Sequence, residues 1–446
     1  MSYFELRLIE EPVLEFYQGL SSNPRDITRL KPLSYALLLD EVQEIKIKLL
    51  VDNETRKLAK TLIHHLIHGY ENTFQYPPFR TVFGLEVSFE EKDDITQVDL
   101  RNKDDFFTKL ESSVDDIRDS GMRGIIIIAS PFIPRDLFYE AKYRSMVNYS
   151  RSNIRLQFIK RKSIEQCLQK GFEFLLLNLA TAIYAKIGGI PWRLAHAIIP
   201  TGLILGISFI RERGSENSEE VIYYGAIEVL DKYGEHLITK MRMFSAPASK
   251  LKTEGLYVPY DRMYEILRDI LKKNKVPLII LHKSSGFVEN EELKALYDVI
   301  QEYKRDDFEI MYLAVHLKGV VLYRIFDTDV VDYSVSRGTL LIDKTSILRK
   351  RHWRGILFTT GRLPGRKRRG RLGTPRPLEL DVVENESPLG LTDIASQVLA
   401  LTKLDWNTTE PEIRKPITLK YSRKAARLAC RNKILSMEIG DIRDLI

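Results

Sequence analysis

Apolar residues in the first 200 positions recur with two different periods, which alternate along the chain. Residues 44–51 (EIKIKLLV) have the alternating, branched pattern of a strand, and residues 124–130 (GIIIIAS) form a continuous apolar run. A continuous run of this length is typical of a parallel strand covered on both faces. Strands are also expected at 81–89 and 153–159, and helices at 54–70, 104–120, 134–147 and 172–186. This βαβ alternation predicts an open, Rossmann-like parallel sheet.

A different order of elements follows residues 188–194 (GGIPWRL), which we interpret as a domain junction. Apolar strands at 202–210, 221–230 and 235–244 are separated by short polar turns, which predicts an antiparallel meander. Helices are then expected at 259–273 and 289–303, and strands at 277–282, 309–317 and 319–326. This is the element order of an RNase H-like fold. We therefore expect an α/β protein with an amino-terminal segment (1–38) that packs on the second domain or on a partner, a Rossmann-like domain (39–197) and an RNase H-like domain (198–446).

The composition indicates a folded intracellular protein. Hydrophobic residues make up 44% of the chain and charged residues 29%, as in ordinary globular proteins. Two cysteines, Cys167 and Cys430, are too few for a disulfide framework or a thiolate zinc site. The start of the chain (MSYFELRLIEEP) has acids where a secretory signal has basic residues. We expect a cytoplasmic location.

The net charge of +7 is concentrated in one stretch. Residues 349–376 contain eleven Lys and Arg and neither Asp nor Glu, and Gly and Pro interrupt them too often for a regular helix. A loop of guanidinium groups suits a phosphate backbone, whereas a solvated loop, an anionic membrane or an acidic protein partner are the other interpretations. The candidate backbone contacts are Arg362, Arg366, Lys367, Arg368, Arg369, Arg371 and Arg376.

Several strings resemble the Argonaute/Piwi family in their order along the chain. They are AKIGGIPWRL (185–194), LGISF (205–209), LHKSSGF (281–287), FTTGR (358–362), LGTPRPL (372–378), LALTKLDWN (399–407) and KPITLKYSRKAARLA (415–429). The resemblance implies a MID domain followed by a PIWI domain. A chain of 446 residues leaves no room for N and PAZ domains, which is the layout of short prokaryotic Argonautes.

The resemblance also predicts that the metal-dependent cutting chemistry of the family is lost. RNase H-like nucleases hold two divalent cations with clustered carboxylates. Ser208, either Ser284 or Ser285, and Arg423 occupy the matching positions here. A hydroxyl is a poor substitute for a carboxylate on Mg²⁺, and a cation repels the metal. Three glutamates could in principle rescue a site: Glu212 and Glu228, both expected to face solvent or a turn, and Glu254, which could align with the family's mobile glutamate.

The resemblance further implies a pocket for the 5′ phosphate of a guide strand. The matching residues are Phe138, Lys142, Gln157 and Lys186, with Tyr139 as an alternative aromatic residue. Phe138 and Lys142 have i, i+4 spacing, so a ring and an ammonium can address one ligand from one helix face. Each residue also has an ordinary interpretation, namely a core ring, a solvent-facing strand residue or a cation at a helix end.

The chain end GDIRDLI adds a candidate Mg²⁺ site. In the family the terminal carboxylate and a glutamine help to hold Mg²⁺ over the guide phosphates, which implies Gln157 and the carboxylate of Ile446 as ligands here. A carboxylate beside a phosphate needs a bridging cation, since the two would otherwise repel. A frayed terminus is the alternative.

The expected function is recognition of a nucleic acid through a 5′-phosphorylated guide, without cleavage. The resemblance implies an RNA guide, a single-stranded DNA target, an APAZ-type partner that replaces the missing amino-terminal half, and a toxic effector, either soluble or membrane-associated, in defence against invading DNA. Two rivals remain: an active RNase H-like guided nuclease, and a protein that binds nucleic acid or a membrane surface without a guide.

Overall fold

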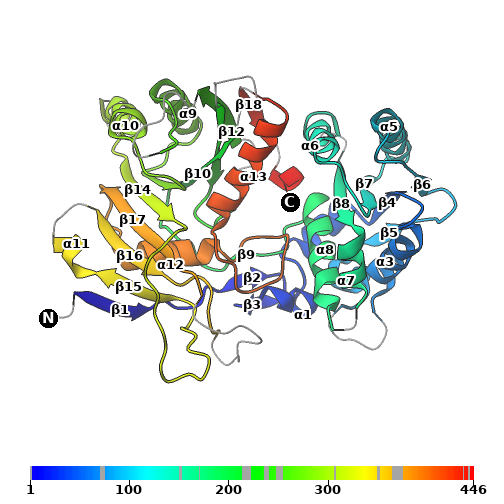
Figure 1. Ribbon diagram of the computed structural model, residues 1–446, viewed down its shortest axis with the longest axis horizontal. Helices are drawn as coiled ribbons and strands as arrows, with labels where there is room; N and C mark the ends of the chain where they lie inside the picture. Colours follow the sequence, from blue (N-terminus) through cyan, green and yellow to red (C-terminus); the bar gives the residue numbers. More distant parts are fainter. Residues whose placement is uncertain are drawn as a thin grey trace. The chain divides into compact units, whose positions relative to one another are not determined.

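The computed structural model describes residues 3–70, 76–149, 153–169, 171–212, 222–235, 241–247, 255–305, 308–348, 352–363, 375–434, 436–439 and 442–445. The chain divides into two compact units (Figure 1). Unit 1 consists of Met1–Val13, Leu194–Leu404 and Pro411–Gly440. Unit 2 consists of Leu14–Arg193, Asp405–Glu410 and Asp441–Ile446. Each unit therefore takes segments from distant parts of the sequence.

Unit 2 is built on a parallel sheet with the order β5-β4-β7-β8, and β6 pairs with β4 beyond the end of β5. Its central strands are the apolar runs, because both faces of a parallel sheet are covered and polar residues would be desolvated there. The strands are β4 (Glu44–Val51), β5 (Glu86–Ser88), β6 (Ile95–Gln97), β7 (Arg123–Ser130) and β8 (Ile154–Lys160). The parallel sheet expected from βαβ alternation is confirmed.

Helices cover both faces of this sheet (Figure 1). On one face, apolar side chains of α5 and α6 form a core with β4, β7 and β8 that includes Phe106, Leu110 and Ile128. The helices of the unit are η1 (Pro24–Asp26), α1 (Ile27–Leu30), α2 (Tyr35–Glu41), α3 (Arg56–His68), α4 (Phe79–Phe83), α5 (Lys103–Asp119), α6 (Arg135–Arg144), η2 (Ser145–Tyr149), α7 (Arg161–Cys167), α8 (Glu173–Lys186) and η6 (Ile442–Leu445). A hairpin of β2 (Leu14–Phe16) and β3 (Gly19–Ser21) and the short β9 (Arg193–Leu194) complete it.

Unit 1 contains a mixed ten-stranded sheet with the order β1-β15-β16-β17-β14-β13-β10-β11-β12-β18. The expected meander is confirmed: β10, β11 and β12 are antiparallel neighbours, and β10, β13 and β14 are parallel. The strands are β1 (Phe4–Leu8), β10 (Leu203–Arg211), β11 (Ile222–Leu230), β12 (Met241–Pro247), β13 (Leu278–Lys283), β14 (Met311–Lys318), β15 (Thr339–Asp343), β16 (Trp353–Leu357), β17 (Leu378–Asn385) and β18 (Ser436–Ile439).

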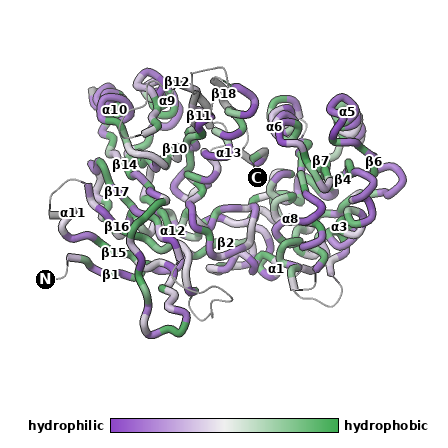
Figure 2. The backbone as a smooth tube through the Cα atoms, viewed as in Figure 1, coloured by the Kyte–Doolittle hydropathy of each residue, from purple (hydrophilic) through white to green (hydrophobic). Residues whose placement is uncertain are grey.

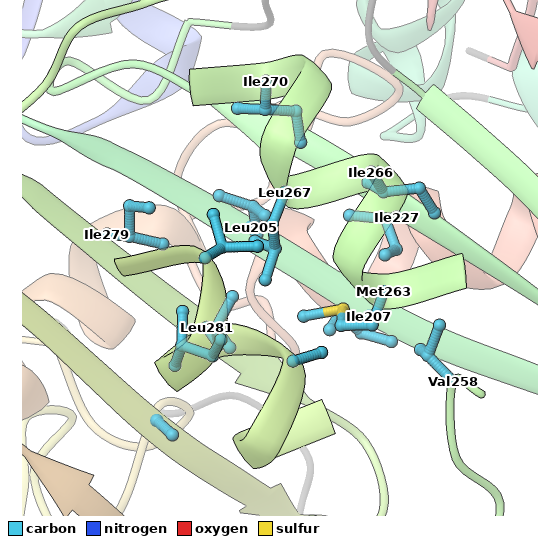
Figure 3. Packing of buried hydrophobic residues seen from close by; sticks show 14 of the residues in the cluster. Leu205, Ile207, Ile227, Val258, Met263, Ile266, Leu267, Ile270, Ile279 and Leu281 are labelled. Atoms are coloured by element: carbon cyan, nitrogen blue, oxygen red, sulfur yellow. The ribbon is translucent and has the colours of Figure 1, made fainter. Parts of the chain in front are cut away.

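The main core of unit 1 lies between this sheet and two helices, α9 (Tyr260–Lys273) and α10 (Lys294–Arg305). Figure 3 shows Leu205 and Ile207 of β10 packed against Met263 and Leu267 of α9. Burying each such side chain contributes about 1.5–3 kcal/mol. The other helices are η5 (Glu289–Leu293), α11 (Lys344–Leu348), α12 (Leu391–Leu401) and α13 (Ile417–Arg431). Helix α13 packs across β10 and β11.

Three local predictions differ from the structure. Residues 81–89, expected as one strand, are the end of α4 followed by β5, because Phe79, Val82 and Phe83 have helical spacing and Gly84 ends the helix with φ +78°. Residues 319–326, expected as a strand, form no strand, and helix α7 was not expected. The third meander strand is described over Met241–Pro247, and residues 236–240 of the expected 235–244 lie outside the described residues.

The first 38 residues are shared between the units. Met1–Val13 belongs to unit 1, whereas the rest belongs to unit 2. In unit 1, the Glu11 carboxylate accepts from Nε of the buried Arg337 over 2.9 Å and also pairs with the buried Lys403. Among the described residues, no helix is long and apolar enough to cross a membrane.

Candidate functional site

Gln157 and Lys186 meet in unit 2, although 29 positions separate them in the sequence. The Nζ of Lys186 donates to Oε1 of Gln157 over 2.6 Å and to the carbonyl oxygen of Leu156 over 2.8 Å. Lys186 is 2% exposed, at the carboxyl end of α8, where a cation is favoured by the helix dipole. Both of these acceptors are neutral oxygen atoms, so they orient the ammonium without cancelling its charge.

Phe138 and Lys142 share one face of α6, as their spacing predicts. The Lys142 Nζ lies 5.9 Å from the centroid of the Phe138 ring, within cation–π range. Both side chains are half-buried. The alternative ring, Tyr139, is also half-buried and meets Phe138 edge to face at 5.0 Å between centroids.

Strand β8 connects the two residue pairs. The Phe138 ring contacts the ring of Phe158 at 4.8 Å between centroids. Phe158 is the neighbour of Gln157, and successive side chains of a strand point to opposite faces. The two pairs therefore approach β8 from its two faces, and a ligand that joins them would have to reach around the edge of the strand. That edge is open, because β8 ends the sheet of the described residues of unit 2.

The last described residues also belong to unit 2. The short helix η6 packs against α8, and Leu445 is buried. Gly188, just after α8, has φ +112°, and a Cβ there would lie 2.7 Å from Nη1 of Arg123 and 3.5 Å from Nη1 of Arg443. The left-handed φ favours glycine at this position, which lies beside the two guanidinium groups. Ile446, the predicted carboxylate ligand, lies outside the described residues.

In unit 1, helix α13 covers the first of the positions expected to carry metal-binding carboxylates. Ser208 on β10 is fully buried, and its hydroxyl donates to the carbonyl oxygen of Leu419 over 3.2 Å. Gly206 lies on the same face of β10, and a Cβ there would come within 2.2 Å of the carbonyl oxygen of Thr418. A carboxylate at Ser208 would thus face backbone carbonyl oxygens, which would repel it.

The other two positions do not supply acids either. The Ser285 hydroxyl donates to the carbonyl oxygen of Leu256 over 2.6 Å, and Ser284 is half-buried. Arg423 is exposed on α13. Next to the serines, Lys283 and Glu292 form a fully buried ion pair, in which the Glu292 carboxylate also accepts from the amides of Val258 and Val288. This pair holds the turn that follows β13.

Glu228 differs from the sequence expectation. It was expected to face solvent or a turn, but it is 1% exposed and pairs with Gly206 in the β10–β11 register, which places it on the face that α13 covers. Burial lowers the pKa of Lys424 on α13 to about 8, and the nearby Glu228 carboxylate opposes this shift. Sequence reasoning failed because the acid is desolvated beside a lysine rather than in water. Glu212 is half-buried after β10, and Glu254 lies outside the described residues.

In the part of the chain that the structure describes, no group of three or more His, Cys, Asp or Glu side chains is arranged to hold a metal ion. Gln157 offers an amide oxygen, a ligand type suited to Mg²⁺, which prefers hard oxygen donors. Gln157 and a terminal carboxylate are thus oxygen donors of the type that Mg²⁺ takes, although the Lys186 ammonium on Oε1 of Gln157 would oppose a cation at that oxygen.

Most Lys and Arg residues of the basic stretch lie outside the described residues, including Arg366, Lys367, Arg368, Arg369 and Arg371. At its margins, Arg362 pairs with Asp327 over 3.0 Å. Arg376 is exposed, and its carbonyl oxygen accepts from Nε of Arg414.

A second group of cations, which sequence reasoning missed as a binding surface, lies on α13. We call Lys420, Arg423, Lys424 and Arg427 the α13 cation face, since their spacing places them on one side of the helix. Burial and the charge of Lys424 lower the pKa of Lys420 to about 8. Burial also lowers the pKa of Lys415, with contributions from Arg423 and Arg414. A bound anion would relieve the repulsion between these cations. The i, i+4 spacing of basic residues in KYSRKAAR was the available signal.

Comparison with known proteins gives one consistent family. The family model of the Piwi domain matches residues 133–433. A protein argonaute of Cereibacter sphaeroides is 25% identical over 284 residues, which cover 59% of this chain and 34% of that protein. Clostridium butyricum Argonaute, solved with a guide DNA and a 19-mer target DNA, has a TM-score of 0.68 at 18% identity, covering 98% of this chain and 54% of that one. Drosophila Piwi has a TM-score of 0.67 at 14% identity, with coverage of 98% and 56%.

The chain thus spans about half the length of these solved structures and about a third of the curated relative. At such identities the structural likeness shows the fold. The expected mixed α/β fold, with a parallel sheet and an RNase H-like sheet, is confirmed.

Proposed function

Because the chain belongs to the Piwi domain family, as its resemblance to Argonautes led us to expect, we propose that it binds a guide nucleic acid by a 5′ phosphate and recognises a complementary strand without cutting it. Unit 2 anchors the guide end, and unit 1 grips the paired backbones. Base pairing supplies the sequence specificity, while the protein contributes phosphate contacts that do not depend on sequence.

The observation that carries the proposal is the contact between Lys186 and Gln157. A buried ammonium that donates to neutral oxygen atoms of Leu156 and Gln157 is suited to a phosphate dianion, since charge-assisted hydrogen bonds are strongest in a desolvated site. Lys142 adds a second cation, and Phe138 offers a ring on which a base can stack. A Mg²⁺ ion between Gln157 and the Ile446 carboxylate would neutralise charge on the phosphates.

The absence of cutting is supported by unit 1. Ser208 lies beneath α13, and Ser284 and Arg423 do not offer carboxylates. The α13 cation face suits a nucleic-acid backbone rather than a pair of divalent metals, which its positive charge would repel. Binding through these cations and the basic stretch would weaken steeply as salt concentration rises, because each phosphate contact releases counterions.

A protein that recognises a target strand without cutting it needs another way to act on the invading nucleic acid. We therefore propose that an RNA guide directs this chain to single-stranded DNA, and that an APAZ-type partner and a toxic effector convert recognition into defence. The solved Clostridium butyricum relative carries a guide DNA and a target DNA, so the sugar of the guide must be determined directly.

The test is to purify the native protein, extract the nucleic acid that copurifies, and determine its length, sugar and 5′ end. Short RNAs of uniform length with a 5′ phosphate are expected. Absence of any enriched species, or equal affinity for 5′-phosphorylated and 5′-hydroxyl guides, contradicts the proposal and favours binding without a guide.

The Lys142→Gln variant tests whether the protein binds the 5′ phosphate in a specific pocket or attracts nucleic acid only by its general positive charge. It should weaken binding of a 5′-phosphorylated guide by roughly tenfold or more and leave the 5′-hydroxyl guide unchanged, since one charge-assisted contact is lost. Lys57→Gln, at an exposed position on α3, is the matched control and should change neither. Incubating the loaded protein with a complementary strand and Mg²⁺ or Mn²⁺ should leave that strand intact, and guided cutting would establish the nuclease rival instead.

A further inference from the structure

Strand β1 forms one end of the unit 1 sheet and has an unpaired outer edge among the described residues. Its inner edge pairs antiparallel with β15, and the amide of Lys344 donates to the carbonyl of Tyr3 while the amide of Ile9 donates to the carbonyl of Gly338. Hydrogen-bonded residues alternate along an antiparallel strand. Odd-numbered residues therefore bond to β15, and the backbone groups of Phe4, Leu6 and Leu8 point outward.

The same three residues form an apolar row on one face of β1. Leu6 is 64% exposed and Leu8 is 67% exposed. Phe4 contacts the ring of Tyr323 at 6.1 Å between centroids. The residue opposite Leu6 in the sheet is Leu341, which packs against a small core that includes Val321. The apolar row of β1 therefore continues into the segment between β14 and β15.

Figure 2 shows hydrophobic positions along that segment, residues 319–338. Its first part, residues 319–326, was expected to be a strand, but no described strand includes it. Large side chains that are more than half exposed are Val320, Leu322, Tyr323, Phe326, Val331 and Tyr333. Exposed apolar patches of several hundred Å² commonly mark protein interfaces.

Soluble proteins usually protect a sheet edge with a proline, a bulge or inward-pointing charges. Phe4–Leu8 contains no proline, and its register with β15 is regular. The only charges of the strand, Glu5 and Arg7, lie on the face toward α12, where Arg7 contacts Glu5 and the hydroxyl of Thr392. The edge therefore has neither a proline nor a bulge, and its other face is apolar.

In β1, FELRL, apolar and charged positions are symmetric around Leu6, and the two charged positions, Glu5 and Arg7, carry opposite signs. If two such strands pair antiparallel about Leu6, each Leu6 faces its symmetry mate and Phe4 faces Leu8. On the other face, Glu5 lies opposite Arg7 and Arg7 opposite Glu5, so opposite charges meet at both positions. The outward backbone groups of Phe4, Leu6 and Leu8 fall in the hydrogen-bonded positions of this pairing.

We propose that a second copy of this chain docks on this edge, so that two ten-stranded sheets join through β1 into one continuous sheet with twofold symmetry. Such an interface is isologous, and it closes at a dimer. The self-complementary charges select a copy of the same strand, and the apolar residues of 319–338 extend the contact beyond β1 itself. The proposal is independent of guide binding.

Sedimentation velocity of the full-length chain over a wide concentration range tests the dimer. Glu5→Arg places two arginines opposite each other, and Arg7→Glu places two glutamates opposite each other. Either variant should raise the dimer dissociation constant by about tenfold, since both cross-strand pairs become repulsive. Glu10→Arg, an exposed charge reversal beyond β1, is the matched control and should leave the dimer unchanged.

Mixing the two variants provides the decisive arm. The two arginines on β1 of the Glu5→Arg chain then lie opposite the two glutamates on β1 of the Arg7→Glu chain, so a mixed dimer should form although neither variant pairs with itself. A misfolded variant could not give this rescue. The proposal is overturned if the wild-type chain stays monomeric, or if neither charge reversal changes the dimer dissociation constant. It is also overturned if the β1 edge becomes protected only when a different polypeptide binds.

Discussion

The Nζ of Lys186 lies 2.6 Å from Oε1 of Gln157, which joins the carboxyl end of α8 to the middle of β8. Gln157 can accept from this ammonium and still place its neutral amide beside an anion. A carboxylate in its place would hold Lys186 more strongly and would repel a phosphate. Under the proposed function, Gln157 serves the ligand as well as the fold, to which it also contributes a hydrogen bond from Nε2 to the carbonyl oxygen of Phe158 over 3.1 Å.

Gln157→Glu separates these two roles. The new carboxylate pairs with Lys186, so the free energy of unfolding should stay within about 1 kcal/mol of wild type. Affinity for a 5′-phosphorylated guide should fall roughly 10- to 100-fold through charge repulsion, and affinity for a 5′-hydroxyl guide should change little. Fluorescence anisotropy with the two guides measures both. An equal loss for the two guides would show that Gln157 does not lie beside the phosphate.

Ser208→Asp should destabilise unit 1 rather than create a metal site. The carboxylate would be buried beneath α13 against the carbonyl oxygen of Leu419, at a cost of about 3–5 kcal/mol for an uncompensated buried charge. Ser208→Ala is the control and should cost about 1 kcal/mol, the value of one hydrogen bond. Urea denaturation measures both. A stable Ser208→Asp protein that binds Mn²⁺ would contradict this account.

His282 makes the stability of the protein depend on pH. Its Nε2 lies 3.1 Å from Oε1 of Gln397 and its Nδ1 lies 3.3 Å from the Thr418 hydroxyl. Burial lowers its pKa from 6.5 to about 4, and the hydrogen bond with Gln397 opposes this shift. Between these values the unfolded chain binds more protons than the folded one, so stability falls as the pH falls from 6.5 toward 4.

Between pH 6.5 and pH 4, this histidine should lower the free energy of unfolding by an amount on the order of 3 kcal/mol. The His282→Gln variant should be less stable than wild type at pH 7, but its free energy of unfolding should decrease less on acidification. His316→Gln is the comparison variant, because burial and the charge of Lys318 lower the pKa of His316 to about 4 as well. Denaturation at pH 7 and pH 5 measures the difference, and identical pH slopes for wild type and His282→Gln would refute the assignment.

Glu11 holds the amino-terminal segment in unit 1 through two buried cations, Arg337 and Lys403. Glu11→Ala leaves both cations without this carboxylate, so unfolding should become easier by about 3–5 kcal/mol. Glu10→Ala, exposed and adjacent, should stay within about 0.5 kcal/mol. Thermal unfolding of the two variants checks this prediction. Equal melting temperatures would mean that Arg337 and Lys403 are neutralised by other groups.

Much of the fold could be predicted where the hydrophobic pattern has one physical explanation. Strand β4 coincides with the expected 44–51, because alternating branched residues fit only a strand. The segment 319–326 has the same kind of pattern but no sheet partner among the described residues, and pairing cannot be read from one segment alone. The prediction of a strand around Gly84 was wrong for a related reason, since a short apolar run fits either a helix or a strand.

The candidate site was less accessible to sequence reasoning. Spacing alone relates Phe138 to Lys142, because they share one helix. The approach of Gln157 to Lys186 depends on how α8 packs against β8, and only the family resemblance suggested it. The burial of Glu228 and Lys424 arises from the packing of α13 on β11, which no local pattern encodes. The proximity of Lys420 to Lys424, by contrast, follows from their i, i+4 spacing on one helix.

The division of the chain between its two units constrains the order in which the protein can mature. The unit that carries Gln157 and Lys186 includes Asp441–Ile446 as well as Leu14–Arg193, while unit 1 takes most of the chain between them. During synthesis, residues 14–193 therefore cannot complete this unit by themselves, because Asp405–Glu410 and Asp441–Ile446 also belong to it. The unit can take its final form only after most of unit 1 has been made, so the two units cannot mature strictly one after the other.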